Sequence, residues 1–329
     1  MTRSLQAFLE GLIDYAGLFP PARLPMDAAV ARWAAVLHEP FSLAVARFIC
    51  PASRLDEFAQ QARPRLGPSE RWPVSLLATP VERPEDVVSA LQSDLRAMAD
   101  VERASDGRLH PAAVELRLPA AAAEEFPPAR LADLLGAAAE TVAGTLGDRG
   151  RLFVEAALPR SWAERTPVVV AALADCAPGA AVERPGFKLR CGGLEPAAFP
   201  PVERVALTLD ACDACGVPFK ATAGLHHPVR ALDPGVGVEA HGFLNVFGAG
   251  ILLAAGAIGR DELVEVLAER DAAAFAFDDD AFAWRGARAP VEAIRRARAE
   301  RVTSFGSCSV DEPWEDLASL GLLPAPRAG

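Results

Sequence analysis

Two lysines stand out among the residues whose side chains could do chemistry. Lys188 and Lys220 are the only lysines in a chain whose Lys and Arg residues total 33. Arginine stays protonated in proteins and forms no Schiff base, whereas a lysine amine can lose its proton and attack a carbonyl carbon. The scarcity of lysine therefore indicates two positions at which an amine itself is required.

Both lysines lie near the carboxyl end of a short apolar segment typical of a β-strand, and three further charged residues share that position. The five are Glu115 in AAVELRLP (112–119), Glu155 in RLFVEAALP (151–159), Lys188 and Arg190 in GFKLRCGG (186–193), and Lys220 in VPFKATAGL (217–225). A buried charge costs on the order of several kcal/mol unless it is paired, so we expect one network. In it, a second cation lowers the pKa of a lysine while a carboxylate moves protons. Structural ion pairs at strand ends are the alternative interpretation.

The elements that must position these residues follow an alternating pattern. Short apolar runs alternate with longer Ala/Leu/Glu/Arg stretches of helical period, which predicts parallel strands joined by helices. Strands are predicted at 41–51, 72–80, 112–119, 151–159, 186–193 and 217–225, and a two-strand turn at 275–284. Helices are predicted at 83–104, 128–147, 200–216 and 241–256. About seven such units, without a dinucleotide G-x-G-x-x-G or a P-loop, favour the α/β class and a closed (β/α)₈ TIM barrel.

The chain is expected to form one domain over 1–329, with an embellishment inserted over 228–290 between the strand of Lys220 and the C-terminal segment. Residues 323–329 are expected to be a frayed tail. The sequence contains no run of about 18 apolar residues and no signal peptide, so we expect a cytoplasmic protein without a membrane partner. The net charge of −11 disfavours nucleic acid.

Six cysteines in a reducing compartment are expected to be buried thiols without disulfides. Cys212 and Cys215 form a C-x-x-C, but they fall in a predicted helix and no second pair lies at zinc-finger spacing. A metal site built from Glu115, Glu155 and the histidine pair 226–227 is a weaker alternative, because two neighbouring lysines oppose cation binding. We expect no cofactor and no metal.

A series of segments, in chain order, resembles the strand motifs of one enzyme family. They are LIDYAGLFPPA (12–22), ARFICPASRL (46–55), SLLATP (75–80), AVELRL (113–118), RLFVEAAL (151–158), GFKLRCGG (186–193), VPFKATAGLHH (217–227) and TSFGSCSVDEPWEDLASLG (303–321). The family is the deoxyribose-phosphate aldolases, which are class I (Schiff-base) enzymes on a (β/α)₈ barrel. Each motif alone is weak, but the series carries both lysines in order.

The resemblance implies a role for each matched residue. Lys188 falls on the Schiff-base lysine, and Lys220 falls on the second lysine, which lowers the pKa of the first. Glu115 stands where the family has its proton-shuttling aspartate, Glu155 matches a glutamate, and Asp14 is implied to position Lys220 or substrate hydroxyls. An anionic group of the substrate is implied to lie in a cradle formed by Gly192, Gly193, Gly224, Gly306 and Ser307.

Several departures from the family pattern indicate a different substrate. Leu189-Arg190-Cys191 replaces a Thr-Ser-Thr beside the implied imine, and Glu115 is one methylene longer than aspartate. His226 and His227 stand in place of an arginine. Arg190 and His226 are therefore candidate ligands for a carboxylate or a differently placed phosphate.

These observations predict a carbon–carbon lyase of the aldolase type in carbohydrate metabolism. The expected partner is a small aldehyde or ketone, with a phosphorylated or carboxylated substrate included in that class. The alternative is a barrel isomerase, or a metabolite-binding protein without catalysis, that uses the same pocket for an anionic ligand. The sequence leaves homo-oligomer formation open.

Overall fold

A computed structural model describes residues 1–147, 150–176 and 184–324. Its eight parallel strands form a closed barrel in the order β1-β13-β7-β6-β5-β4-β3-β2. The strands are β1 (Ile13–Tyr15), β2 (Val45–Pro51), β3 (Trp72–Leu77), β4 (Leu109–Arg117), β5 (Arg151–Glu155), β6 (Gly186–Arg190), β7 (Phe219–Thr222) and β13 (Val302–Ser307). The predicted (β/α)₈ barrel is therefore confirmed. Pattern alone did not predict β1 and β13, because β1 has three residues and β13 is rich in small polar ones.

The helices lie between these strands, as the alternating pattern predicts. They are α1 (Arg3–Leu9), α2 (Met26–Val36), α3 (Leu55–Ala62), α4 (Val87–Ala104), α5 (Ala120–Glu125), α6 (Pro128–Leu146), α7 (Trp162–Asp175), α8 (Val202–Cys215), α9 (Phe243–Ala254), α10 (Arg260–Ala268), α11 (Val291–Glu300) and α12 (Asp311–Ser319). Two predicted helices, at 128–147 and 200–216, end at the glycine that the sequence pattern indicated. Gly147 and Gly216, at φ 62° and 63°, end α6 and α8 in conformations that glycine adopts without strain. No helix in the described ranges is both long and apolar enough to span a bilayer.

The residues group into two compact units. One comprises 23–38 and 47–188 and is called the Lys188 unit below; the other comprises 1–22, 39–46 and the chain from Leu189 onward and is called the Lys220 unit. The names reflect the lysine that each contains.

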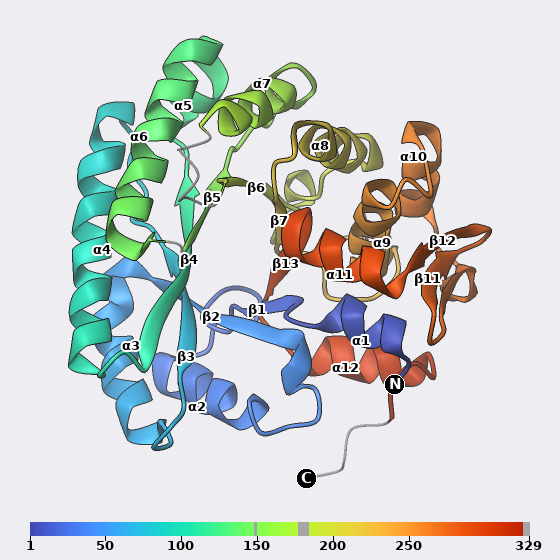
Figure 1. Cartoon of the computed structure of the whole chain (residues 1–329), viewed down its shortest axis with the longest axis horizontal. Coiled ribbons are helices and arrows are strands. Elements are labelled where there is room, and N and C mark those ends of the chain that lie inside the picture. Colours follow the sequence, from blue (N-terminus) through green and yellow to red (C-terminus); the bar gives the residue numbers. More distant parts are fainter. Residues whose placement is uncertain (148–149, 177–183, 325–329) are drawn as a thin grey trace. The chain divides into compact units, whose positions relative to one another are not determined.

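In the Lys188 unit, β3, β4 and β5 are covered by helices (Figure 1). Helix α4 contacts β4, helix α6 contacts β5, and α6 lies between α4 and α7. The outer faces of the strands supply the apolar side of this layer: Leu116, Val154 and Phe187 are buried in register across β4, β5 and β6. Burial of these side chains holds the strands in register and thereby fixes what their inner faces present.

In the Lys220 unit, helix α9 lies against β13. Phe243 and Phe247 of α9 each contact the ring of Phe305, with centroids 5.7 Å apart in both pairs. The segment 228–290 contains, besides α9 and α10, the hairpin β8 (Ala231–Asp233)–β9 (Val238–Ala240) and the strands β10 (Phe275–Phe277) and β11 (Ala281–Trp284). The two-strand turn predicted at 275–284 is thus confirmed.

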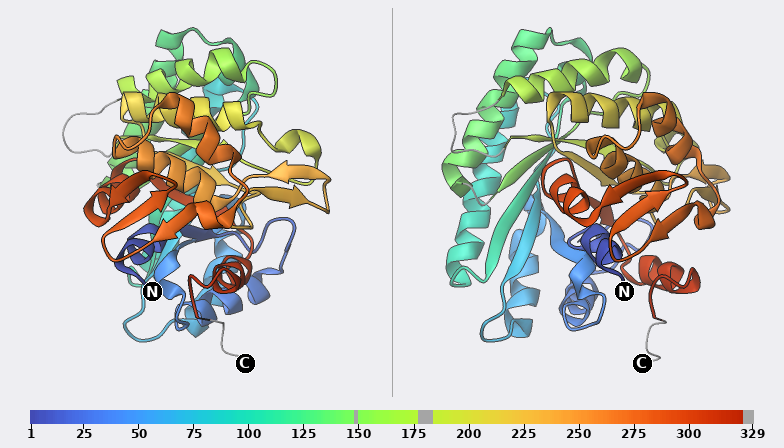
Figure 2. Two further views of the ribbon diagram at one scale, coloured as in Figure 1. Left: turned by 90° about the vertical axis from the view of Figure 1, so that its right-hand side faces the viewer. Right: turned by 45° about the vertical axis from the view of Figure 1, so that its right-hand side comes forward.

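The hairpin β10–β11 continues into a third antiparallel strand, β12 (Ala287–Pro290), which the sequence pattern did not predict. Figure 2 shows this sheet beside α1, and β11 contacts that helix. Of the tail expected at 323–329, residues 325–329 lie outside the described residues.

Arg298 of α11 connects the start of β13 with the end of α1 through hydrogen bonds. Its guanidinium is buried and donates to the carbonyls of Phe8 (3.0 Å) and Glu10 (3.1 Å) and to those of Val302 and Thr303. We expect Arg298→Leu to lower the free energy of unfolding by about 2–4 kcal/mol, because buried carbonyls lose their donor.

Urea unfolding followed by circular dichroism measures this loss. Arg295→Leu is the matched control, since Arg295 lies on the same helix, is exposed and pairs only with Glu292. We expect that control to change stability by less than about 0.5 kcal/mol. Equal losses in the two variants would contradict the role given to Arg298.

Candidate active site

Lys188 lies between two carboxylates in the Lys188 unit. Its Nζ is 2.7 Å from Oε2 of Glu115 and 2.9 Å from Oε2 of Glu155. The side chains of Lys188 and Glu115 are only 4% and 1% exposed. The other oxygen of Glu115 accepts a hydrogen bond of 2.6 Å from the hydroxyl of Ser75 on β3. One buried amine therefore has two proton acceptors within reach.

The strand register explains why these side chains meet. Lys188 is the Cα partner of Glu155 across β5 and β6, so both project from the same face. On the neighbouring strand β4, Glu115 is the Cα partner of Phe153. Phe153 lies two residues before Glu155 and therefore on the same face of β5. The β3–β4 pairing shifts by one residue between Val74 and Ser75, with the extra residue in β4, so that Ser75 is the Cα partner of Ala113, two residues before Glu115.

The carboxylates decide the protonation of Lys188. Burial alone lowers its pKa, but the charges and hydrogen bonds of Glu115 and Glu155 outweigh burial, so the pKa is raised above its ordinary value. Lys188 is therefore an ammonium at neutral pH. The expectation that its pKa is lowered is wrong, because the nearest groups to the amine are carboxylates.

Lys220 forms a second buried cluster, in the Lys220 unit. Its ammonium donates to Oδ2 of Asp14 and, at 3.3 Å, to the hydroxyl of Ser304. Ser304 in turn donates to the same oxygen of Asp14 at 2.7 Å. Asp14 and Lys220 are fully buried, and Ser304 is 1% exposed. The structure thus brings together Lys220 and the aspartate that the resemblance assigned to it.

Each cluster contains a serine that sequence reasoning missed. Ser75 supports Glu115 and Ser304 supports Asp14, so each lysine–carboxylate pair has a hydroxyl on a neighbouring strand. Both serines lie in segments of the motif series, 75–80 and 303–321, but the resemblance gave neither a role, and the inward alternation along β3 and β13 could have indicated them.

Close packing explains the glycines at 192, 193 and 224, which were predicted to cradle an anion. A Cβ on Gly192 would lie 2.5 Å from Cα of Gly224, and Gly224 itself has a φ of +71°. A Cβ on Gly193 would lie 2.8 Å from the Cβ of Ala198. Glycine is required at these positions whether or not a ligand binds.

Arg190, which was predicted as a substrate ligand, lies at the end of β6 and is exposed.

The segment with Gly306 and Ser307 leads into a helix start that is already capped. Ser307 donates to the carbonyl of Ser309 at 2.6 Å, and the hydroxyl of Ser309 accepts from the amides of Asp311 and Glu312. The first turn of α12 therefore carries two acidic side chains next to its amides. Their charge disfavours a phosphate at this helix end.

The two histidines of the loop after β7 pair with α12. His226 Nδ1 is 3.1 Å from Glu312, and His227 Nδ1 is 2.7 Å from Asp316. The hydrogen bond from His226 is the main cause of the lowered pKa of Glu312. Among the described residues, no group of three or more His, Cys, Asp and Glu side chains is placed to hold a metal ion.

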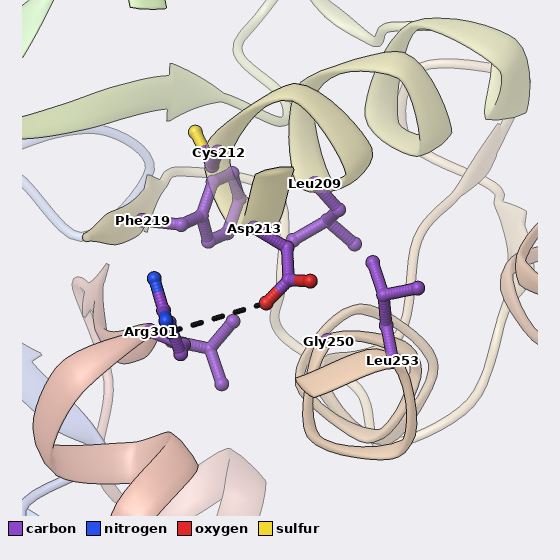
Figure 3. A pocket seen from close by; sticks show the side chains of 8 residues that line it. Leu209, Cys212, Asp213, Phe219, Gly250, Leu253 and Arg301 are labelled. Atoms are coloured by element: carbon purple, nitrogen blue, oxygen red, sulfur yellow. Dashed lines mark ion pairs between the residues drawn. The ribbon is translucent and has the colours of Figure 1, made fainter. Parts of the chain in front are cut away.

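A small pocket lies at the amino ends of β7 and β13 in the Lys220 unit (Figure 3). It is lined by Leu209, Cys212, Asp213, Phe219, Gly250, Leu253, Arg301 and Val302. Phe219 and Val302 are the first residues of β7 and β13, and the pocket has room for roughly one water molecule. Burial raises the pKa of the Cys212 thiol, which keeps it protonated. This pocket is not a substrate site.

Comparison with known proteins finds only distant structural similarity. No protein-family model matches the chain, and no curated protein matches it in sequence. Among solved structures, a tetrameric deoxyribose phosphate aldolase from Aeropyrum pernix is similar, with 11% identity, a TM-score of 0.44, and 69% of this chain and 85% of that chain covered. Human mitochondrial enolase superfamily member 1 is also similar, with 12% identity, a TM-score of 0.40, and 68% and 41% covered. At these identities and TM-scores the similarity adds nothing to the barrel topology described above.

We expect the Lys220 cluster to behave as a coupled pair in stability measurements. Asp14→Asn and Lys220→Met each leave a buried charge without its counterion, and each should lower the free energy of unfolding by about 3–5 kcal/mol. The double variant leaves neither charge, so its loss should be clearly smaller than the sum of the two single losses. Denaturant unfolding of the four proteins measures the coupling. Additive losses would contradict a direct ion pair.

Proposed function

We propose that this barrel is a class I aldolase or lyase, in which Lys188 forms a Schiff base with a small aldehyde or ketone. The observation that carries the proposal is the amine of Lys188 held 2.7 Å and 2.9 Å from two carboxylates in a nearly buried environment. Such a group combines a nucleophile with the proton acceptor that it needs. Its position at the carboxyl end of a barrel strand is where TIM-barrel enzymes place catalytic residues.

The proposed reaction begins with a proton transfer from the Lys188 ammonium to Glu115 or Glu155. The neutral amine adds to the carbonyl carbon, and the carbinolamine loses water as a carboxylic acid returns the proton. In the resulting iminium, Glu115 takes the proton of the substrate's β-hydroxyl as the carbon–carbon bond breaks. The electron pair of that bond forms an enamine, and the fragment that carried the hydroxyl leaves as the first carbonyl product. Glu115, held in place by Ser75, supplies the proton that converts the enamine into the second iminium, and water then releases the product.

Lys220 and Asp14 form the second lysine–carboxylate pair of the proposal. Both are fully buried, and the hydroxyl of Ser304 fixes the shared carboxylate oxygen. We propose that Asp14 positions Lys220, as the resemblance implies, and that Lys220 is not the attacking amine. Removal of Lys220 should therefore leave the site of covalent attachment unchanged.

Trapping with borohydride tests the covalent step. Incubation with small aldehydes and ketones followed by reduction should leave one mass adduct, located on Lys188 by peptide mapping. Lys188→Met should abolish the adduct, whereas Lys220→Met should leave its position unchanged. An adduct on Lys220 alone, or the absence of any lysine adduct across the panel, would sink the assignment.

The raised pKa of Lys188 gives the trapping reaction a defined pH dependence. Only the neutral amine attacks, and a raised pKa makes that fraction small at neutral pH, so the rate should climb between about pH 6 and pH 10. Glu115→Gln removes one of the two carboxylates that raise the pKa, so the midpoint should move to lower pH. A midpoint that stays in place or rises in this variant would show that Glu115 does not control the amine.

A second candidate is a barrel that binds a metabolite, or isomerises it, without an imine. The same ion pairs favour it, because a lysine held by two carboxylates with a raised pKa is also a stable structural arrangement. The two functions differ in the Lys188→Met variant. Under a binding role this variant keeps most of its ligand affinity, measured by calorimetry, whereas under the Schiff-base function it loses covalent capture completely.

A further inference from the structure

A third charged residue lies in the same row as Lys188 and Glu155. Across β4, β5 and β6, Arg117 is the Cα partner of Glu155, and Glu155 is the Cα partner of Lys188. Partners in a parallel ladder project to the same side of the sheet. All three residues belong to the Lys188 unit. Arg117 therefore shares the inner face with the proposed nucleophile, two strands away, which is about 10 Å between Cα atoms.

The burial along β4 supports this direction. Leu116 and Leu118, on either side of Arg117, are 3% and 2% exposed, which places them on the helix-covered face. Arg117 is exposed although it lies on the inner face, and it is the last residue of β4. Its guanidinium is consequently at the solvent-open, carboxyl end of the strand, above the buried carboxylate of Glu115.

Arg117 has no carboxylate partner among the described residues, unlike the arginines that follow β2 and β3. Arg54, which follows β2, pairs with Glu57 at 2.8 Å, and Arg83, which follows β3, pairs with Asp86 at 2.9 Å. Glu155, the register partner of Arg117, is used by Lys188. The guanidinium of Arg117 is thus available for an external anion.

The charges of the buried cluster create a need for such a cation. One ammonium and two carboxylates, on Lys188, Glu115 and Glu155, sum to −1 and repel an anionic substrate. The guanidinium of Arg117 brings the net charge of these four side chains to zero, and it does so from the last residue of β4.

We infer that Arg117 binds an anionic group of the substrate, so that the substrate class is a small carbonyl compound carrying a carboxylate or a phosphate. This inference rests on the proposed function, in which the carbonyl carbon of the same molecule bonds to Lys188. A guanidinium holds either anion through two parallel hydrogen bonds and so orients the carbonyl as well as attracting it. Arg117 is a specificity residue in this scheme and takes no part in proton transfer.

Matched pairs of probes test the inference. Pyruvate and acetone differ by a carboxylate, and glycolaldehyde phosphate and glycolaldehyde differ by a phosphate. The measurement is the concentration of each probe that half-saturates the borohydride-trapped adduct on Lys188. Arg117→Ala should raise this concentration about 10- to 100-fold for the anionic probe that fits the site, with less than a twofold change for its neutral counterpart.

Two further variants make the result specific. Arg117→Lys keeps the charge without the two-pronged geometry and should recover part of the loss. Arg96→Ala is the control, because Arg96 is an exposed arginine on α4 in the same unit, and it should leave all four values unchanged. The pair of probes that responds identifies the anion as carboxylate or phosphate.

The failures of the two proposals are distinguishable. If Lys188 is trapped but Arg117→Ala changes anionic and neutral probes alike, or changes neither, the inference about Arg117 is overturned and the Schiff-base function stands. If no probe is trapped on the wild-type protein, the Schiff-base function fails. In that case, thermal stabilisation by pyruvate or glycolaldehyde phosphate that disappears in Arg117→Ala upholds the anion site, and equal behaviour of the two proteins overturns it.

Discussion

The pairing of each buried lysine with a carboxylate is the constraint on which the barrel interior depends. An amine without a counterion would either lose its proton or draw water into the core, since desolvating an isolated charge is costly. Glu115 and Glu155 meet this need for Lys188, and Asp14 meets it for Lys220. The same pairing that permits burial supplies proton acceptors, so structural necessity and proposed chemistry use one set of atoms.

The hydroxyls behind the carboxylates complete this arrangement. A carboxylate that faces an ammonium with one oxygen still has lone pairs to satisfy, and Ser75 supplies a donor to the free oxygen of Glu115. At Asp14 the hydroxyl of Ser304 and the ammonium of Lys220 share one oxygen. In both clusters a small polar residue on an adjacent strand holds the carboxylate in one orientation.

Much of the fold was predictable because it depends on local pattern. The apolar runs that became β2 to β7 bury one face against helices, and that requirement is visible in the sequence. The site was predictable only in part. Glu115, Glu155 and Lys188 could be named from their strand ends, but the direction of the Lys188 pKa follows from distances of 2.7 Å and 2.9 Å that sequence does not contain. Ser75 meets Glu115 through a β3–β4 pairing that contains an extra residue in β4, and no propensity indicates that irregularity.

The burial of both lysines also determines how the protein surface reacts. The chain has two lysines, and their side chains are 4% and 0% exposed. Arginine provides every other strong cation, and a guanidinium does not acylate or form stable adducts with ordinary sugars under conditions that modify amines. The part of the chain that the structure describes therefore presents no lysine amine to solvent. Under the proposed function, a carbonyl compound would meet no lysine amine on the described surface and would form an imine only inside the barrel.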